Sequence, residues 1–240
     1  MFTSDELQKL YNDIRECHIC PRMEKEKALR LTQVVNPGSD VFIVSQTLAE
    51  KQVRKTGVNF FTLKGKLGKT GSNLEKFLNK FNRTVFPYQE VQISSNATIP
   101  KCKSDSLSVY STDIAQCYPG KKNTGKGDRS PKKDEIQNCI TKGFLLREIE
   151  LMKPKLILLM GKSSRNSFFE YVLHASYPRS LSAHISEIVQ SGRIPQYNLG
   201  NRSVYLLPIQ HASGANPRFF EMVANDQLIE MIRAVLGTGC

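Results

Sequence analysis

The chain has 240 residues, which suits one α/β domain with insertions, and 40% of them are hydrophobic, enough to bury a core. Its formal net charge of +12 is unusual for a soluble metabolic enzyme and suits a polyanionic partner, although a generally basic, solvated surface explains it as well. The longest apolar run in a predicted strand, residues 156–160, is too short to cross a bilayer, which excludes a membrane span there.

Helical and strand patterns alternate along the chain. Each predicted strand is short, rich in Val, Ile and Leu and bounded by polar or turn residues, as buried parallel strands are. This alternation predicts a three-layer α/β/α fold around a central, four-stranded, mostly parallel sheet. In chain order the expected elements are a helix at 4–16, a strand at 41–44, a helix at 72–81, a strand at 109–115, a helix at 130–153, strands at 155–160 and 203–209, and a helix at 218–236.

Three polar, turn-rich stretches interrupt this pattern, at residues 82–108, 119–129 and 174–201. They are expected to be insertions or mobile loops. No linker is clear enough to divide the chain, so a single domain over residues 1–240 is expected. Ligands of such sheets bind at the carboxyl ends of the strands, where we expect the functional residues.

Four of the six cysteines have a spacing that suggests metal binding. Cys17 and Cys20 form a C-x-x-C pair, and Cys117 and Cys139 follow far downstream, separated by 21 residues. A zinc ribbon would require a second close pair, so four thiolates from separate elements favour a 4Fe–4S cluster, with zinc or ordinary buried cysteines as alternatives. Because cysteines without a secretory signal indicate a reducing compartment, a cytoplasmic protein is expected, and we expect a monomer.

Several segments resemble the iron–sulfur (family 4-type) branch of the uracil-DNA glycosylase superfamily. Residues 109–117, VYSTDIAQC, resemble the family pattern VYITNVVKC, and residues 68–78, GKTGSNLEKFL, resemble GKAGQLLDKLL. Residues 55–61, KTGVNFF, and residues 206–217, LLPIQHASGANP, resemble the TGRPFVG segment and the histidine motif T.HP…L…NP. The resemblance implies an α/β DNA glycosylase whose residues 1–40 carry the first two cluster cysteines, with Cys117 and Cys139 as the other ligands within residues 109–161, the cluster and base-reading segment.

The resemblance also implies roles for individual residues. Phe60 matches the phenylalanine that stacks on the flipped base, with a place in the core beside Phe61 as the lesser alternative. His211 matches the histidine that supports the leaving base through its O2 atom. DNA contacts are expected from a basic loop and from a predicted helix start, at Lys121, Lys122, Lys126, Arg129, Asn216 and Arg218.

The chain departs from the family in the segment that activates water. The family sequence GEAPG falls on residues 45–49, SQTLA, so its acid falls on Gln46, which has no carboxylate. Glu50 is close in sequence and is a possible substitute as general base. An inactive, DNA-binding relative is therefore one alternative function.

The second departure is at the base-reading position. The family asparagine, which suits the O4 acceptor and N3–H donor of uracil, falls on Asp113. An ionised aspartate only accepts hydrogen bonds, so it suits the N4 amino group of cytosine, whose N3 would then require a proton. We therefore expect a monofunctional glycosylase acting on a cytosine-type, modified base, in a role such as defence against viral DNA; a conventional uracil-DNA glycosylase in repair is the other alternative.

No nucleotide cofactor is expected. The GKT at residues 68–70 and the GKS at residues 161–163 lack the upstream glycine of a P-loop, because Leu63 and Leu156 stand at that position. DNA is the only partner that the sequence predicts.

Overall fold

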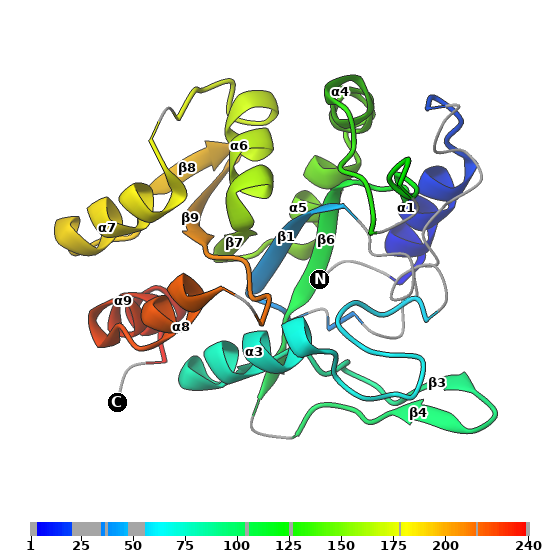
Figure 1. Ribbon diagram of the computed structural model, residues 1–240, viewed down its shortest axis with the longest axis horizontal. Coiled ribbons are helices and arrows are strands. Elements are labelled where there is room, and N and C mark those ends of the chain that lie inside the picture. The colour runs from blue at the N-terminus through cyan, green and yellow to red at the C-terminus, as the bar shows by residue number, and fades with distance from the viewer. Residues whose placement is uncertain are drawn as a thin grey trace.

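The computed structural model describes residues 4–20, 35–36, 38–47, 56–103, 106–124, 127–177, 179–214 and 216–238, which form three layers (Figure 1). The central layer is a five-stranded sheet in the order β6-β1-β7-β9-β8, in which only β8 is antiparallel to its neighbour. The expected α/β/α class is confirmed, but four strands were expected and β8 is the fifth. The strands are β1 (Val41–Thr47), β6 (Tyr110–Ala115), β7 (Leu156–Met160), β8 (Gln196–Leu199) and β9 (Arg202–Ile209).

Successive residues of the central strands face opposite sides of the sheet, and both faces are buried. In β1, Val41 and Ile43 pack on one face while Phe42 and Val44 pack on the other, and all four side chains are fully buried. Helices α3 (Lys69–Leu78), α7 (Leu181–Ser191), α8 (Pro217–Val223) and α9 (Asp226–Leu236) contribute to the first core. Helices α1 (Ser4–Glu16), α4 (Lys133–Thr141), α5 (Phe144–Met152) and α6 (Gly161–Tyr171) contribute to the second.

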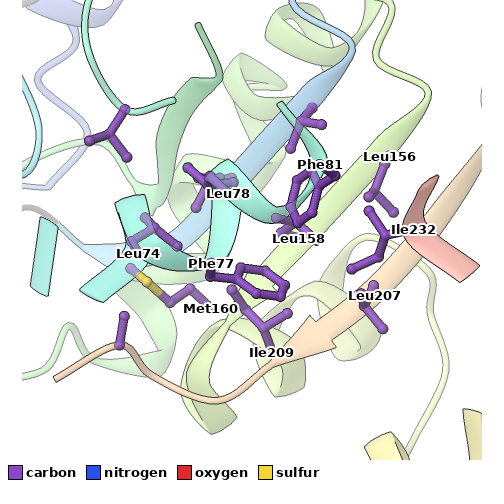
Figure 2. Packing of buried hydrophobic residues seen from close by; sticks show 14 of the residues in the cluster. Leu74, Phe77, Leu78, Phe81, Leu156, Leu158, Met160, Leu207, Ile209 and Ile232 are labelled. Carbon is purple, nitrogen blue, oxygen red and sulfur yellow. The ribbon is translucent and has the colours of Figure 1, made fainter. Parts of the chain in front are cut away.

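Helix α3 is anchored on the sheet by one apolar face. Leu74 and Phe77 point towards the side chains of β7 and β9, among them Leu158 and Ile209 (Figure 2). The helix starts at Lys69, earlier than expected, and the end of the expected span, residues 79–81, is the 3-10 helix η3 (Asn79–Phe81). This packing holds the amino end of α3 over the carboxyl edge of the sheet, where the site described below lies.

Two of the expected helices are each divided in two. Gly143, with φ of 71°, separates α4 from α5, since this left-handed conformation cannot continue a helix. Asn225 separates α8 from α9, and its side chain accepts a hydrogen bond from the Leu228 amide at 2.9 Å to cap α9. The first helix has the expected bounds. In the described ranges, no helix has the length and apolar character needed to cross a membrane.

The expected loops contain regular structure that their polar sequences concealed. Residues 174–201 include α7 and β8, and residues 82–108 include four short strands. Two of these form an antiparallel hairpin that projects from the body of the domain (Figure 1). The four are β2 (Arg83–Thr84), β3 (Val91–Ser94), β4 (Ala97–Ile99) and β5 (Leu107–Ser108).

Candidate active site

A pocket of about 470 Å³ lies at the carboxyl ends of β1, β6, β7 and β9. Four residues that the sequence predicted as functional share its wall: Gln46, Phe60, Asp113 and His211. They come from segments far apart in the chain, and the parallel sheet brings them to one edge, as the strand-end rule predicts. The remaining described residues of the wall are Ser45, Thr47, Asn59, Thr70, Met160, Gly161, Lys162 and Ser163.

Phe60 both lines the pocket and belongs to the core. Its backbone is left-handed, with φ of 72°, a conformation that is strained for phenylalanine. The Phe60 carbonyl accepts a hydrogen bond from the Gly68 amide at 2.8 Å. A Cβ atom on Gly71 of α3 would lie 2.8 Å from the Phe60 Cβ atom, so this glycine lets the helix pack directly against Phe60. The ring is thus held in one place at the pocket wall, where a flat base can stack on it.

His211 lies two residues after the end of β9 and is an exposed residue of the pocket wall. Its Nδ1 atom accepts a hydrogen bond from the Ser213 amide at 3.2 Å, and its carbonyl accepts one from the Asn216 side chain at 3.1 Å. Gly161, at φ of 87°, passes under the ring, because a Cβ there would touch His211 Cβ and Cδ2 at 3.5 Å. Loss of surrounding water lowers the pKa of His211 below its ordinary value of 6.5, which favours the neutral ring at pH 7.

Asp113 lines the pocket from β6 and is 2% exposed. Its partner in the parallel ladder is Ser45 of β1, which lines the same wall. Among the described residues of the wall, Asp113 is the only carboxylate. The interpretation that this side chain is placed to meet a bound ligand therefore agrees with the geometry.

A buried polar network fixes the backbone on both sides of Asp113. The carboxylate of Glu148 on α5 is fully buried and accepts hydrogen bonds from the Tyr110 hydroxyl and from Thr112 Oγ1, each at 2.7 Å. The side-chain amide of Gln116 donates to the Asp113 carbonyl at 2.7 Å and to Glu148 at 3.3 Å. Such charge-assisted hydrogen bonds in a buried site are strong, so they keep β6 and Asp113 in place.

The water-activating segment is described only in part. Gln46 lines the pocket, and the Thr47 hydroxyl donates to the Cys117 carbonyl at 3.4 Å, which joins the end of β1 to the cysteine region. Glu50, the expected substitute base, lies outside the described residues. An amide oxygen at Gln46 can accept a hydrogen bond from a water molecule and orient it, but it cannot take up its proton at neutral pH.

The four predicted cysteine ligands lie in one region. Cys17 follows α1, Cys117 follows β6, and Cys139 is on α4. The pKa of the Cys139 thiol is raised to about 12, mainly by burial and in part by the charges of Cys117, Cys20 and Cys17, while a hydrogen bond with the Gln116 backbone opposes the change. A charge affects another group only at short range, so the four side chains are neighbours.

The surroundings of the cysteines bear on what they could bind. In the part of the chain that the structure describes, no three His, Cys, Asp or Glu side chains are grouped closely enough to hold a single metal ion. The Asn138 side chain donates to Cys20 Sγ at 3.4 Å, as outer groups do around thiolate ligands. Three of the four thiols are buried, and cysteine thiolates are the ligands that iron–sulfur clusters require.

Some of the basic side chains that were predicted to contact DNA are already paired with carboxylates of the protein. Lys122 is exposed, whereas Lys121 is paired with Asp128 at 2.9 Å. Arg129 makes two hydrogen bonds, of 2.7 and 2.8 Å, to the buried Glu135 carboxylate, which anchors the loop to the start of α4. Lys126 lies outside the described residues.

The two candidates near the start of α8 also have protein partners. Arg218 is exposed and contacts the Ser182 hydroxyl at 3.3 Å. Asn216 occupies the N-cap position of α8 but makes no side-chain cap; it holds the His211 loop instead.

Sequence reasoning missed other residues of the wall. Lys162 and Ser163 line the pocket at the start of α6, although their GKS sequence was set aside as a false P-loop. Their position directly after a predicted strand could have identified them, because ligands bind at the carboxyl ends of such strands. The same reasoning was applied to His211. Asn59 also lines the pocket and donates to Ser111 Oγ at 2.7 Å, and only its place beside Phe60 pointed to it.

Taken together, the wall supplies an aromatic ring, a carboxylate, and an imidazole whose Nδ1 accepts a hydrogen bond from the Ser213 amide, so that in the neutral ring Nε2 carries the proton. This set can stack on a flat heterocycle, bind its polar edge, and stabilise negative charge that develops on it. It is the set that cleavage of a bond to a nucleobase needs.

The comparisons with known proteins agree with this chemistry. The family described as "Uracil DNA glycosylase superfamily" matches residues 32–233 of the chain. The comparison with curated proteins found no match.

Proposed function

The chain belongs to the uracil-DNA glycosylase superfamily, whose members are DNA glycosylases, and from this premise we propose that its pocket excises a flipped-out base and leaves an abasic site. The observation that carries the proposal is the convergence of Phe60, Asp113 and His211 on one pocket at the carboxyl edge of the sheet. Each residue comes from a different segment that resembles the superfamily.

The reaction needs three contributions from the protein. Phe60 stacks on the base, His211 donates from Nε2 to the O2 atom as negative charge develops on the leaving base, and Gln46 orients a water molecule towards the sugar. The sugar becomes an oxocarbenium-like cation, a strong electrophile, so orienting the water contributes more than deprotonating it. Glu50 stays a candidate base.

The base that the pocket accepts is proposed to be of the cytosine type. Asp113 replaces the asparagine that suits uracil, and its carboxylate accepts a hydrogen bond from the N4 amino group but would repel the O4 atom of uracil. Cytosine N3 then requires a proton, carried by Asp113 or by the base. If Asp113 does not contact the base, a conventional uracil-DNA glycosylase in base excision repair is the second function.

Removal of ordinary cytosine would damage the cell's own genome, so a further group must mark the target. The most direct mark is a substituent at C5. Small polar side chains line much of the pocket wall, among them Ser45, Thr47 and Thr70, and leave room beside a pyrimidine ring for such a group. Modified cytosines in viral DNA are a coherent target, which makes defence against such DNA the proposed role.

We also propose that Cys17, Cys20, Cys117 and Cys139 hold a 4Fe–4S cluster. Their spacing supports the proposal, because a zinc ribbon would require a second close pair of cysteines, whereas the thiolates of a cluster can come from separate elements. When bound, the cluster supplies rigidity near the DNA, with no redox step. The Thr47–Cys117 hydrogen bond is the path from this region to the pocket wall.

An excision assay tests the proposed reaction. The protein is incubated with oligonucleotides that carry uracil, cytosine or C5-substituted cytosines, and the products are separated with and without hot alkali. We expect alkali-labile sites from at least one cytosine-type base, and no breaks without alkali, as for a monofunctional enzyme. Because Lys162 lines the pocket, borohydride trapping is included, and it should give no covalent product. Absence of product from every base would favour an inactive, DNA-binding relative.

A further inference from the structure

A tight turn stands beside the pocket at residues 61–66, an insertion between the two segments, 55–61 and 68–78, that resemble the family. Phe61 and Leu67 pair as an antiparallel bridge, and the Thr62 amide donates to the Lys66 carbonyl at 2.8 Å. The turn starts one residue after Phe60 and ends before α3, whose Thr70 also lines the pocket. It is therefore joined to the pocket wall at both ends.

The turn packs against residues of the neighbouring segment 82–108. The Phe61 ring is fully buried and meets the Phe86 ring edge-on, with 5.3 Å between centroids. Gly65 has φ of 72°, and a Cβ atom there would lie only 2.5 Å from the Thr98 carbonyl of β4. Only glycine permits this contact, so the inserted turn rests on the inserted hairpin, and the two insertions support each other.

At its tip the turn exposes an apolar side chain, Leu63, which two lysines follow in the chain. Leu63 is 46% exposed, and Lys64 and Lys66 are exposed as well. Leu63 is three positions after Phe60 in the chain, so their Cα atoms are at most about 11 Å apart. Successive nucleotides along one strand are about 3.4 Å apart, so Leu63 lies within roughly three base steps of a base bound at Phe60.

The loop after His211 offers no comparable side chain. It reads Ala212-Ser213-Gly214-Ala215, where the resembled motif has a leucine before its NP. Ala212 is fully buried, and the aliphatic chain of Lys69 occupies the space that a Cβ on Gly214 would need. A large residue on this loop would thus have to displace Lys69.

We propose that Leu63 is the wedge that enters the base stack when the target base leaves it, and that Lys64 and Lys66 contact the flanking phosphates. An apolar side chain pushed between bases offsets the loss of stacking, and the cations hold it against the duplex. The proposal rests on the proposed function, since it assumes that the pocket takes up a flipped base, and it adds the device that keeps the duplex open.

Binding to a product mimic tests the wedge without knowing which base is excised. The probe is a duplex with a tetrahydrofuran abasic analogue opposite guanine and 2-aminopurine beside it; the same duplex without the lesion and the single strand are references. The wild type should bind the abasic duplex more tightly than the intact one and should raise the 2-aminopurine fluorescence. In Leu63→Ala, affinity for the abasic duplex should fall about tenfold, the fluorescence rise should disappear, and single-strand binding should stay unchanged.

Two variants separate this effect from a general loss of structure. Leu146→Ala removes a similarly exposed leucine, 40% exposed, from α5 and should behave as the wild type. Leu63→Met keeps a large apolar side chain and should restore the fluorescence signal. The wedge is overturned if Leu63→Ala matches the wild type, or if the wild type shows neither abasic preference nor a fluorescence rise. A Leu63-dependent signal in a protein that excises no base would retain the wedge and reject the proposed reaction.

Discussion

The backbone amide of Ser213 donates a hydrogen bond to Nδ1 of His211 at 3.2 Å. In a neutral imidazole one nitrogen accepts and the other donates, so this contact leaves Nε2 carrying the proton. The ring is further fixed by Gly161 beneath it and by the Asn216 amide on its carbonyl. His211 is therefore arranged as a neutral hydrogen-bond donor towards the pocket.

The titration of His211 should reflect this arrangement. Loss of water around the ring lowers its pKa below 6.5, so the neutral form should persist as the pH falls through 6.5 and should be lost only at lower pH. An NMR titration of the four histidines, with His211→Asn to assign the signal, measures this pKa. A midpoint for His211 above 7 would show that the charged ring predominates at neutral pH and would remove the neutral-donor role.

Removal of the His211 side chain should slow the chemical step more than it weakens binding. In single-turnover assays on the best substrate, His211→Ala should reduce the rate about 10²- to 10³-fold, as loss of one donor to a developing anion does elsewhere. DNA affinity should change little. His184→Ala is a poor control because His184 is buried, so the exposed His174→Ala serves instead and should retain the wild-type rate. Equal rates in both variants would exclude His211 from the chemistry.

The sheet could be predicted from sequence because its strands are fully buried apolar runs, such as residues 156–160, and a run of this kind is too costly to expose to water. β8 was missed because its sequence QYNL is half exposed and lacks an apolar run. The division at Gly143 was missed because apolar residues at helical spacing continue on both sides of it. A periodic pattern does not report the φ angle of one glycine.

In the site, the residues within resembling segments were predicted, namely Phe60, Asp113 and His211. Residues that reach the pocket through folding alone were not, as Lys162 illustrates. Glu148 could not be predicted either, because the partners that hold it, Tyr110 and Thr112, lie more than 30 positions away. A buried carboxylate in a helix gives no sequence signal until its partners are known.

Metal content should depend on four cysteines and not on the others. The purified protein should be brown and contain about four irons per chain, as expected of one 4Fe–4S cluster. Cys139→Ser should lose iron, whereas Cys102→Ser should retain it, since Cys102 lies in the insertion beside Pro87. A colourless protein that carries one zinc would keep the four-thiolate site and reject the cluster.

DNA binding should weaken with salt, and the basic loop should account for part of that dependence. Replacement of Lys121, Lys122 and Lys126 by glutamine should reduce affinity for all sequences alike and lower the salt slope by about 0.9 for each phosphate that is no longer neutralised. The expected share of Lys121 is the smallest, because Asp128 already pairs with it. Lys153→Gln is the matched control: this exposed lysine precedes β7, at the opposite edge of the sheet from the pocket. Equal slopes in the triple variant and the control would mean that the loop is only a solvated charge run.

The central claim is that Asp113 selects a cytosine-type base, and the substitution Asp113→Asn tests it most directly. The two side chains are nearly isosteric, so the buried site should keep its packing while the acceptor becomes a donor and acceptor. The measurement is the ratio of single-turnover excision rates for cytosine-type bases and uracil, in the wild type and in the variant. The account predicts that the wild type prefers a cytosine-type base and that Asp113→Asn shifts the ratio towards uracil by about 10- to 100-fold, the effect of about 1–3 kcal/mol for one mismatched buried hydrogen bond. Strong uracil excision by the wild type, unchanged in Asp113→Asn, would contradict it.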